Sequence, residues 1–146
     1  MFNPSQADVR NFFFDVYFKG NLNQPLADLE KIAYEVIVKH PEYHDILSNR
    51  DKYLDFKWSP EMGETNPFLH LSMHLTIIEQ LSIDQPPGIK QLFDKMCTKT
   101  EDKHIAEHEF IDCLGEMLWQ AERNHTQPSL PVYFDCINNK LGKVST

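Results

Sequence analysis

The most constraining feature of the sequence is the segment 66–83, NPFLHLSMHLTIIEQLSI, in which apolar residues recur at helical spacing. At about 100° per residue, His70 and His74 fall inside the apolar stripe, on the same side as Ile77. The polar residues Ser72 and Glu79 gather on the opposite side. Imidazoles on the apolar side face the core, so the chain is predicted to fold around two core histidines.

A second helical segment, 101–124, places a carboxylate on its apolar side. The apolar arc of this segment consists of Ala106, Phe110, Cys113, Leu114, Met117, Leu118 and Ala121. Glu107 falls within the arc, and His104 and His108 lie at its border. A buried carboxylate must be protonated, paired with a cation or bound to a metal, because burying a bare ion costs several kcal/mol.

The remaining segments also show helical spacing, with recognisable start and stop signals. Ser5 is predicted to cap a first helix that ends at Gly20, and Pro25 opens a second that ends before Pro41. Shorter helices are predicted over 41–47, 89–96 and 131–141, with a long connection over 48–65. We therefore predict an all-α fold: a single-domain bundle of about five to seven helices over residues 1–146, with a frayed tail from about residue 142.

Charge and composition exclude several classes of partner. The formal net charge of −8 and the pI near 5.3 predict that the protein does not bind nucleic acid. No apolar run of about 18 residues and no signal-peptide pattern occurs, so we expect no membrane partner and a cytoplasmic location. The three cysteines are odd in number and lack a Cys-x-x-Cys pair, which predicts reduced thiols and neither a disulfide framework nor a thiolate zinc site.

Three His-x-x-x-His pairs occur, at 40/44, 70/74 and 104/108, and this spacing puts two imidazoles on one helical face. Chance placement of seven histidines would give only about 0.3 such pairs, so the excess is informative. The first pair is spoiled because His40 precedes Pro41, and we predict that His40 and His44 lie at the surface.

The other two pairs, together with Glu107, predict a metal site. A metal would satisfy the acceptor nitrogens of two core imidazoles at once and would supply the positive charge that a buried carboxylate needs. The predicted ligands are His70, His74, His104, Glu107 and His108. Imidazole and carboxylate suit zinc, iron, manganese or nickel alike. The alternative is a metal-free His–Glu network that is purely structural.

No Gly-rich phosphate loop and no Gly-x-Ser-x-Gly motif occurs, so nucleotide binding and serine hydrolase chemistry have no support. The motifs NPFLHLxMHL at 66–75, DQPPGI at 84–89, HxxEH at 104–108 and CLGExLW at 113–119 resemble a family of small bacterial proteins known only as a domain of unknown function. The resemblance, which includes the opening MFNPS, covers nearly the whole chain. It implies a bacterial origin and a single helical domain, and it brings no activity.

Two functions fit these observations. The first is a metal-binding helical bundle, which could act as an enzyme by using bound water as nucleophile or base on a small substrate. The second is a non-catalytic interaction or scaffold protein with a protein partner, in which the His–Glu network fixes helix register. The sequence identifies neither a substrate nor an oligomeric state.

Glu107 and Glu101 provide a matched test of the predicted helical face. Glu107→Gln should lower the free energy of unfolding by on the order of 2–5 kcal/mol, because it changes a desolvated cluster. Glu101→Gln, near a helix start and exposed, should cost well under about 1 kcal/mol. Denaturant melts of both variants, with and without added metal, measure the difference. Equal midpoints in both conditions would show that Glu107 does not face the core.

Overall fold

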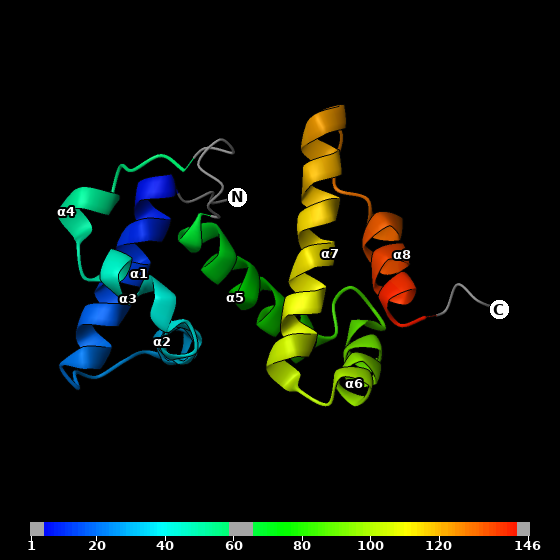
Figure 1. Ribbon diagram of the computed structural model, residues 1–146, viewed down its shortest axis with the longest axis horizontal. Coiled ribbons are helices and arrows are strands. Elements are labelled where there is room, and N and C mark those ends of the chain that lie inside the picture. Colours follow the sequence, from blue (N-terminus) through cyan, green and yellow to red (C-terminus); the bar gives the residue numbers. More distant parts are fainter. Residues whose placement is uncertain (1–4, 59–65, 143–146) are drawn as a thin grey trace. The chain divides into compact units, whose positions relative to one another are not determined.

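The computed structural model describes residues 5–58 and 66–142, and within these ranges it contains eight α-helices, one 3-10 turn and no strand (Figure 1). The elements are α1 (Gln6–Asn21), α2 (Asp28–Val38), η1 (Pro41–Tyr43), α3 (His44–Leu47), α4 (Arg50–Tyr53), α5 (Pro67–Ile83), α6 (Ile89–Thr100), α7 (Lys103–Asn124) and α8 (Leu130–Lys140). The all-α prediction is confirmed. The predicted number of helices is one too low, because α4 forms a single turn inside the segment predicted as a connection.

The chain forms two compact units, residues 1–75 and 76–146, and α5 contributes residues to both. The prediction that residues 1–146 make one domain stays a prediction. The predicted frayed tail falls almost wholly on residues 143–146, which lie outside the described ranges. Among the described helices, none is both long enough and apolar enough to cross a bilayer.

A local signal accounts for the start of α1 but not for its end. Ser5 and Asp8 form a capping box at the start of α1, with the Ser5 hydroxyl accepting from the Asp8 amide at 3.1 Å. Gly20 does not end α1 as predicted, since the helix continues to Asn21. A Cβ on Gly20 would lie 2.1 Å from the Tyr34 ring, so glycine is required there for the close approach of α2.

The first unit is held together by aromatic packing between α1 and the start of α5. Phe68 lies 5.2 Å from Phe14 and 6.5 Å from Phe13, measured between ring centroids, and all three rings are buried. The side-chain oxygen of Asn66 accepts from the Phe68 amide at 2.9 Å and so caps α5. This packing fixes the N-terminal end of α5, which carries His70 and His74, against α1.

Arg10 is the buried polar centre of the same unit. Its side chain is only 1% exposed, and its Nη1 donates to three backbone carbonyls. The acceptors and distances are Tyr53 at 3.0 Å, Leu54 at 2.9 Å and Phe56 at 2.7 Å. These carbonyls lie at the end of α4 and just beyond it, so Arg10 satisfies groups that the short helix leaves open. A contact across more than 40 residues gives no periodicity, which is why α4 was not predicted.

The second unit has a core of rings contributed by α6, α7 and α8. Phe110 lies 5.2 Å from Phe93 and 6.4 Å from Tyr133, and the Tyr133 hydroxyl donates to the Gln80 side chain at 2.7 Å. Burial raises the pKa of Tyr133 far above its usual value, so the phenol remains a neutral donor.

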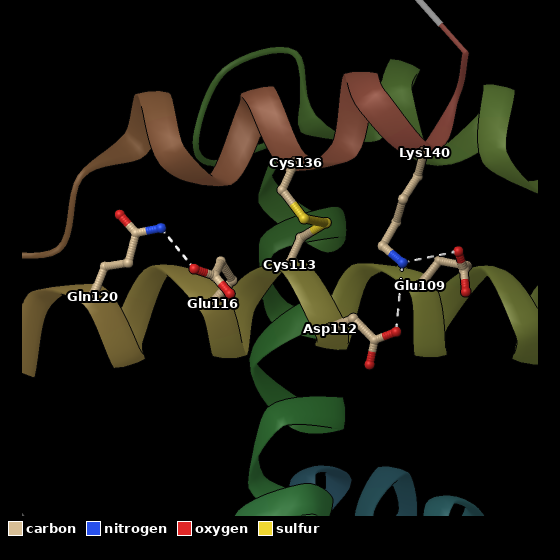
Figure 2. The surroundings of a disulfide bond; sticks show 7 residues. All are labelled: Glu109, Asp112, Cys113, Glu116, Gln120, Cys136 and Lys140. Atoms are coloured by element: carbon tan, nitrogen blue, oxygen red, sulfur yellow. Dashed lines mark hydrogen bonds and ion pairs between the residues drawn. A yellow bond between two sulfur atoms is a disulfide. The ribbon is translucent and has the colours of Figure 1, made fainter.

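Cys113 of α7 and Cys136 of α8 form a disulfide (Figure 2). The prediction that all three cysteines are reduced is therefore wrong for these two, and only Cys97 is a free thiol. The two bonded residues are 23 positions apart, so their pairing depends on how α8 packs on α7. Such packing leaves no spacing signal in the sequence.

Arg10→Met should destabilise the first unit strongly, because methionine keeps an apolar stem but leaves three buried carbonyls without their donor. We expect the free energy of unfolding to fall by about 2–5 kcal/mol. Arg50→Met is the matched control. The Arg50 guanidinium lies over the ring of Phe14, but its ion pair with Asp15 is exposed. The control should lose less than about 1 kcal/mol. Urea melts that give the same midpoint for both variants would contradict this role for Arg10.

Candidate metal centre

α5 presents two histidines one turn apart on a single face. The Nε2 atoms of His70 and His74 lie 3.2 Å apart, and their ring centroids are separated by 4.8 Å. His74 is 1% exposed, whereas His70 is half-buried. The predicted core orientation of this pair is therefore confirmed for His74, with His70 at the edge of the same cluster.

His40 is the third member of the cluster, and the prediction that it lies at the surface is wrong. It is 2% exposed, and its Nε2 lies 3.2 Å from the Nε2 of His70. His40 has φ −125° and ψ 64°, outside the helical region, as expected for a residue before proline. Pro41 does take His40 out of register with His44. With its backbone outside the helix, His40 packs its ring against α5. The ring centroids of His40 and His74 are 4.7 Å apart.

His44 is directed elsewhere. Its Nε2 donates to the carbonyl of Ile37 at 3.0 Å, and its ring packs 5.3 Å from that of Tyr17. The side chain is half-buried rather than at the surface. This imidazole serves the packing of α3 on α1 and α2 and does not join the cluster.

The hydrogen bonds fix which nitrogen of His40 carries a proton. Its Nδ1 lies 2.8 Å from the carbonyl oxygen of Val36, and a carbonyl can only accept, so Nδ1 is the donor. In neutral His40 the Nε2 is therefore the atom with the lone pair. A backbone carbonyl that orients an imidazole through one nitrogen is the usual outer-sphere support of a metal-ligating histidine.

The two 3.2 Å contacts share one atom, the Nε2 of His70, and this limits the protons they can use. If that atom carries a proton, it can donate to only one neighbour. If it does not, it needs donors from both sides, and His40 could donate only as an imidazolium. A proton or a metal ion shared between these nitrogens would satisfy both contacts.

Tyr43 covers one side of the cluster. Its ring is stacked on His40 with an interplanar angle of 3° and a centroid distance of 5.4 Å, and it lies 6.0 Å from His70. Burial, with a smaller contribution from Glu42, raises the pKa of the Tyr43 hydroxyl. A neutral aromatic ring here limits the access of water to His40.

The remaining predicted ligands lie on α7, in the second unit. Asp102 caps this helix, its carboxylate accepting from the amides of His104 and Ile105 at 2.8 and 3.1 Å. Glu107 is 6% exposed, which confirms the helical face assigned to it. Burial raises the pKa of the Cys97 thiol on α6; Asp94 and Glu107 add to the rise, and Lys103 opposes it.

His104 and His108 are half-buried on the same helix, with ring centroids 4.3 Å apart. The Nδ1 of His108 lies 2.9 Å from the carbonyl oxygen of His104 and must donate to it. His108 thus has the same arrangement as His40: Nδ1 is engaged by a carbonyl four residues earlier, and the neutral ring has its lone pair on Nε2.

Of the predicted ligands, the first unit brings His70 and His74 together, and the second carries His104, Glu107 and His108 along α7. The union of these two groups in one site stays a prediction. Sequence reasoning missed His40. The signal that could have found it was the His-x-x-x-His pair combined with Pro41, interpreted as a turned-out ligand rather than a broken pair.

The comparisons with known proteins identify a family but no function. Residues 5–139 match the family described as "Domain of unknown function (DUF1841)". No curated protein and no solved structure matches the chain. This match confirms the resemblance found in the sequence, and it covers both of the compact units. The chain belongs to the DUF1841 family.

Proposed function

We propose that the protein binds one divalent transition-metal ion through the Nε2 atoms of His40, His70 and His74. The observation that carries the proposal is the convergence of these three nitrogens, with two contacts of 3.2 Å that meet at His70. For a tetrahedral zinc ion with Zn–N bonds of about 2.0–2.1 Å, two ligand nitrogens lie roughly 3.3–3.4 Å apart. Two of the three nitrogen pairs, His40–His70 and His70–His74, are therefore close to the spacing that such an ion requires.

The proton count supports a cation in the same place. A buried imidazolium at His40 would carry a charge at a position that is 2% exposed, where desolvation disfavours the charged form. A metal ion removes this difficulty, because it accepts lone pairs from all three rings while His40 keeps its Nδ1 bond to Val36.

The chemistry of the donors limits the choice of metal. Three imidazoles suit zinc, iron, nickel or manganese and do not suit magnesium or calcium, which prefer oxygen ligands. We expect zinc or nickel to bind more tightly than manganese, following the general order of affinity of nitrogen sites.

We propose further that α7 supplies the next donor, as the sequence pattern predicts, and that this donor is His108. The Nδ1 of His108 donates to the His104 carbonyl, so the lone pair of the neutral ring is on Nε2, where a metal can bind. The Val36 carbonyl has the same effect on His40. In this proposal Glu107 and His104 support His108 rather than bind the ion themselves. A four-histidine zinc site would be closed and structural, whereas a three-histidine site with a bound water would be open to catalysis.

The alternative function is a non-catalytic interaction protein with a structural His–Glu network. One observation favours it: a cavity of about 490 Å³ in the first unit is lined by apolar side chains of α1, among them Phe14 and Tyr17. Phe18 and Leu22, on the same wall, are 61% and 53% exposed. Exposed apolar groups of this size are typical of surfaces that contact another protein. The metal experiments below separate the two functions.

Metal binding is tested by equilibrium dialysis of the purified protein against zinc, nickel, manganese or iron(II), followed by elemental analysis. We expect one ion per chain, and a loss of affinity of at least about 100-fold in each of His40→Ala, His70→Ala and His74→Ala, since each removes a ligand. His125→Asn is the control, because His125 is exposed and has a φ of 55° that asparagine tolerates. No uptake by the wild-type protein, or equal uptake by all variants, would refute the proposal.

The pH dependence distinguishes a metal from a proton as the shared cation. An imidazolium has no lone pair, so zinc affinity should fall steeply as the pH drops below about 6.5, the pKa of an unperturbed histidine. At neutral pH, zinc at 1,000 times its Kd should stabilise the fold by about 4 kcal/mol. A thermal melt that zinc leaves unchanged at neutral pH would contradict metal binding to the folded state.

His108→Ala determines whether the site is open or closed. If His108 is the fourth ligand, the variant should bind zinc at least about tenfold more weakly than the wild type. X-ray absorption of the zinc-loaded wild type should then show four nitrogen ligands. A spectrum with three nitrogens and one oxygen, and wild-type affinity in the variant, would instead indicate a water-bearing centre without His108.

A further inference from the structure

The disulfide between α7 and α8 has two sulfurs in different environments. Cys113 is fully buried at 0% exposure, whereas Cys136 is half-buried. Cys136 also lines a surface cavity of about 430 Å³ between the two helices. The other lining residues are Glu116, Gln120, Val132, Asp135, Asn139 and Lys140. Cys136 lines this cavity and Cys113 does not, so a small nucleophile that enters the cavity meets the Cys136 side of the disulfide.

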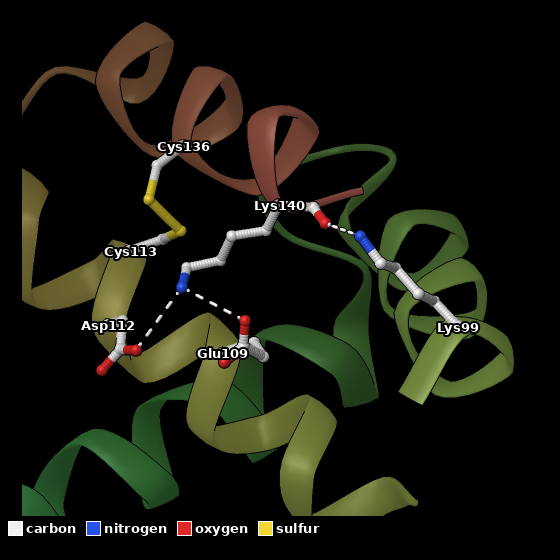
Figure 3. Close-up of polar contacts among 6 residues, drawn as sticks. All are labelled: Lys99, Glu109, Asp112, Cys113, Cys136 and Lys140. Carbon is white, nitrogen blue, oxygen red and sulfur yellow. Dashed lines mark hydrogen bonds and ion pairs between the residues drawn. A yellow bond between two sulfur atoms is a disulfide. The ribbon is translucent and has the colours of Figure 1, made fainter. Parts of the chain in front are cut away.

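The charges around the cavity select among nucleophiles. Glu116 and Asp135 present carboxylates in its wall, and the Glu116 carboxylate accepts from the Gln120 amide at 2.6 Å (Figure 2). The Lys140 ammonium is already paired with Glu109 at 3.2 Å and Asp112 at 3.5 Å (Figure 3). The approach to Cys136 is therefore acidic, which disfavours thiols that carry an additional negative charge.

We propose that the Cys113–Cys136 disulfide is a thiol–disulfide exchange site that is opened at Cys136 by neutral or cationic low-molecular-weight thiols. In the first step the thiolate sulfur bonds to the Cys136 sulfur, the disulfide breaks, and its electron pair passes to Cys113, which takes a proton from water. In the second step another thiolate attacks the small-molecule sulfur of the adduct. The small-molecule disulfide forms, and Cys136 leaves as a thiolate that takes a proton from water. The disulfide gains two electrons, and two molecules of the thiol are oxidised to their own disulfide.

Opening the bond changes how α8 is attached. Besides the disulfide, α8 is held by the buried residues Tyr133 and Ile137 and by the ion pairs of Lys140. A helix of 11 residues has little stability without its tertiary contacts. Loss of the covalent link should therefore increase local opening of α8 without unfolding α6 or α7.

Cys97 does not compete as an internal nucleophile. Burial raises the pKa of its thiol, so the reactive thiolate is scarce at neutral pH. The exchange thus depends on a thiol supplied from outside the protein.

The position of attack is tested on the full-length protein treated with cysteamine under native conditions and then quenched rapidly with an alkylating maleimide in denaturant, so that buried thiols are labelled too. Peptide mapping should find cysteamine on Cys136 and the maleimide on Cys113 in the intermediate. An adduct on Cys113, or reduction that occurs only at a denaturant concentration that unfolds the protein, would overturn the proposal.

The choice of thiol is tested by comparing cysteamine with mercaptoacetate, with both rates corrected for the thiolate present. At low ionic strength we expect cysteamine to react at least about tenfold faster, with a smaller ratio in high salt and in the double variant Glu116→Gln/Asp135→Asn. Equal corrected rates for the two thiols in the wild type would exclude electrostatic selection.

The effect on α8 is measured by hydrogen exchange of the oxidised and reduced protein. Amides in 130–140 should exchange at least about tenfold faster after reduction, while those in 89–100 stay unchanged. Cys113→Ser/Cys136→Ser should match the reduced protein, which separates loss of the bond from side effects of the reductant. Unchanged exchange in 130–140 upon reduction would show that the disulfide does not control the attachment of α8.

Discussion

The local structure around α5 depends on the convergence of three imidazoles. The Nε2 of His70 faces two other Nε2 atoms at 3.2 Å, and the Val36 carbonyl already uses the Nδ1 proton of His40. Imidazole nitrogens this close together could hold a metal ion. Aromatic packing of Phe68 on α1 and the bend at Pro41 bring the rings together, and the energy for this comes from apolar burial elsewhere in the unit. An ion that bound here would find these ligands largely in place, which would reduce the conformational entropy lost on binding.

The helices and their buried faces could be predicted from the sequence, because both depend on local spacing. The faces assigned to His74 and Glu107 are confirmed by exposures of 1% and 6%, and Asn66 caps α5 at the start of the segment predicted as a helix. Periodicity is repeated within each segment, so each helix carries its own evidence. The largest differences are at the start of α2, which begins at Asp28 rather than at Pro25, and at the end of α6, which continues to Thr100 beyond the predicted 89–96.

Contacts between distant segments could not be predicted, and three of them shape the protein. Arg10 stabilises the carbonyls beyond α4, His40 joins the histidine pair of α5, and Cys113 bonds to Cys136. In each case a residue with an ordinary local pattern acquires its role from a partner at least 23 positions away. For His40 the local rule about proline was correct, but the inference of a surface position was not, because leaving a helix does not determine which neighbour a side chain then meets.

The two ends of α8 are secured unequally, and this gives the helix a polarity. At its C-terminal end the Lys99 ammonium donates to the Lys140 carbonyl, and the Lys140 side chain reaches across to α7, so two neighbouring helices hold a single residue (Figure 3). At its N-terminal end Ser129 provides no side-chain cap, and Leu130 is 47% exposed. Thermal fluctuation of α8 should therefore be smallest at Lys140 and largest at Leu130.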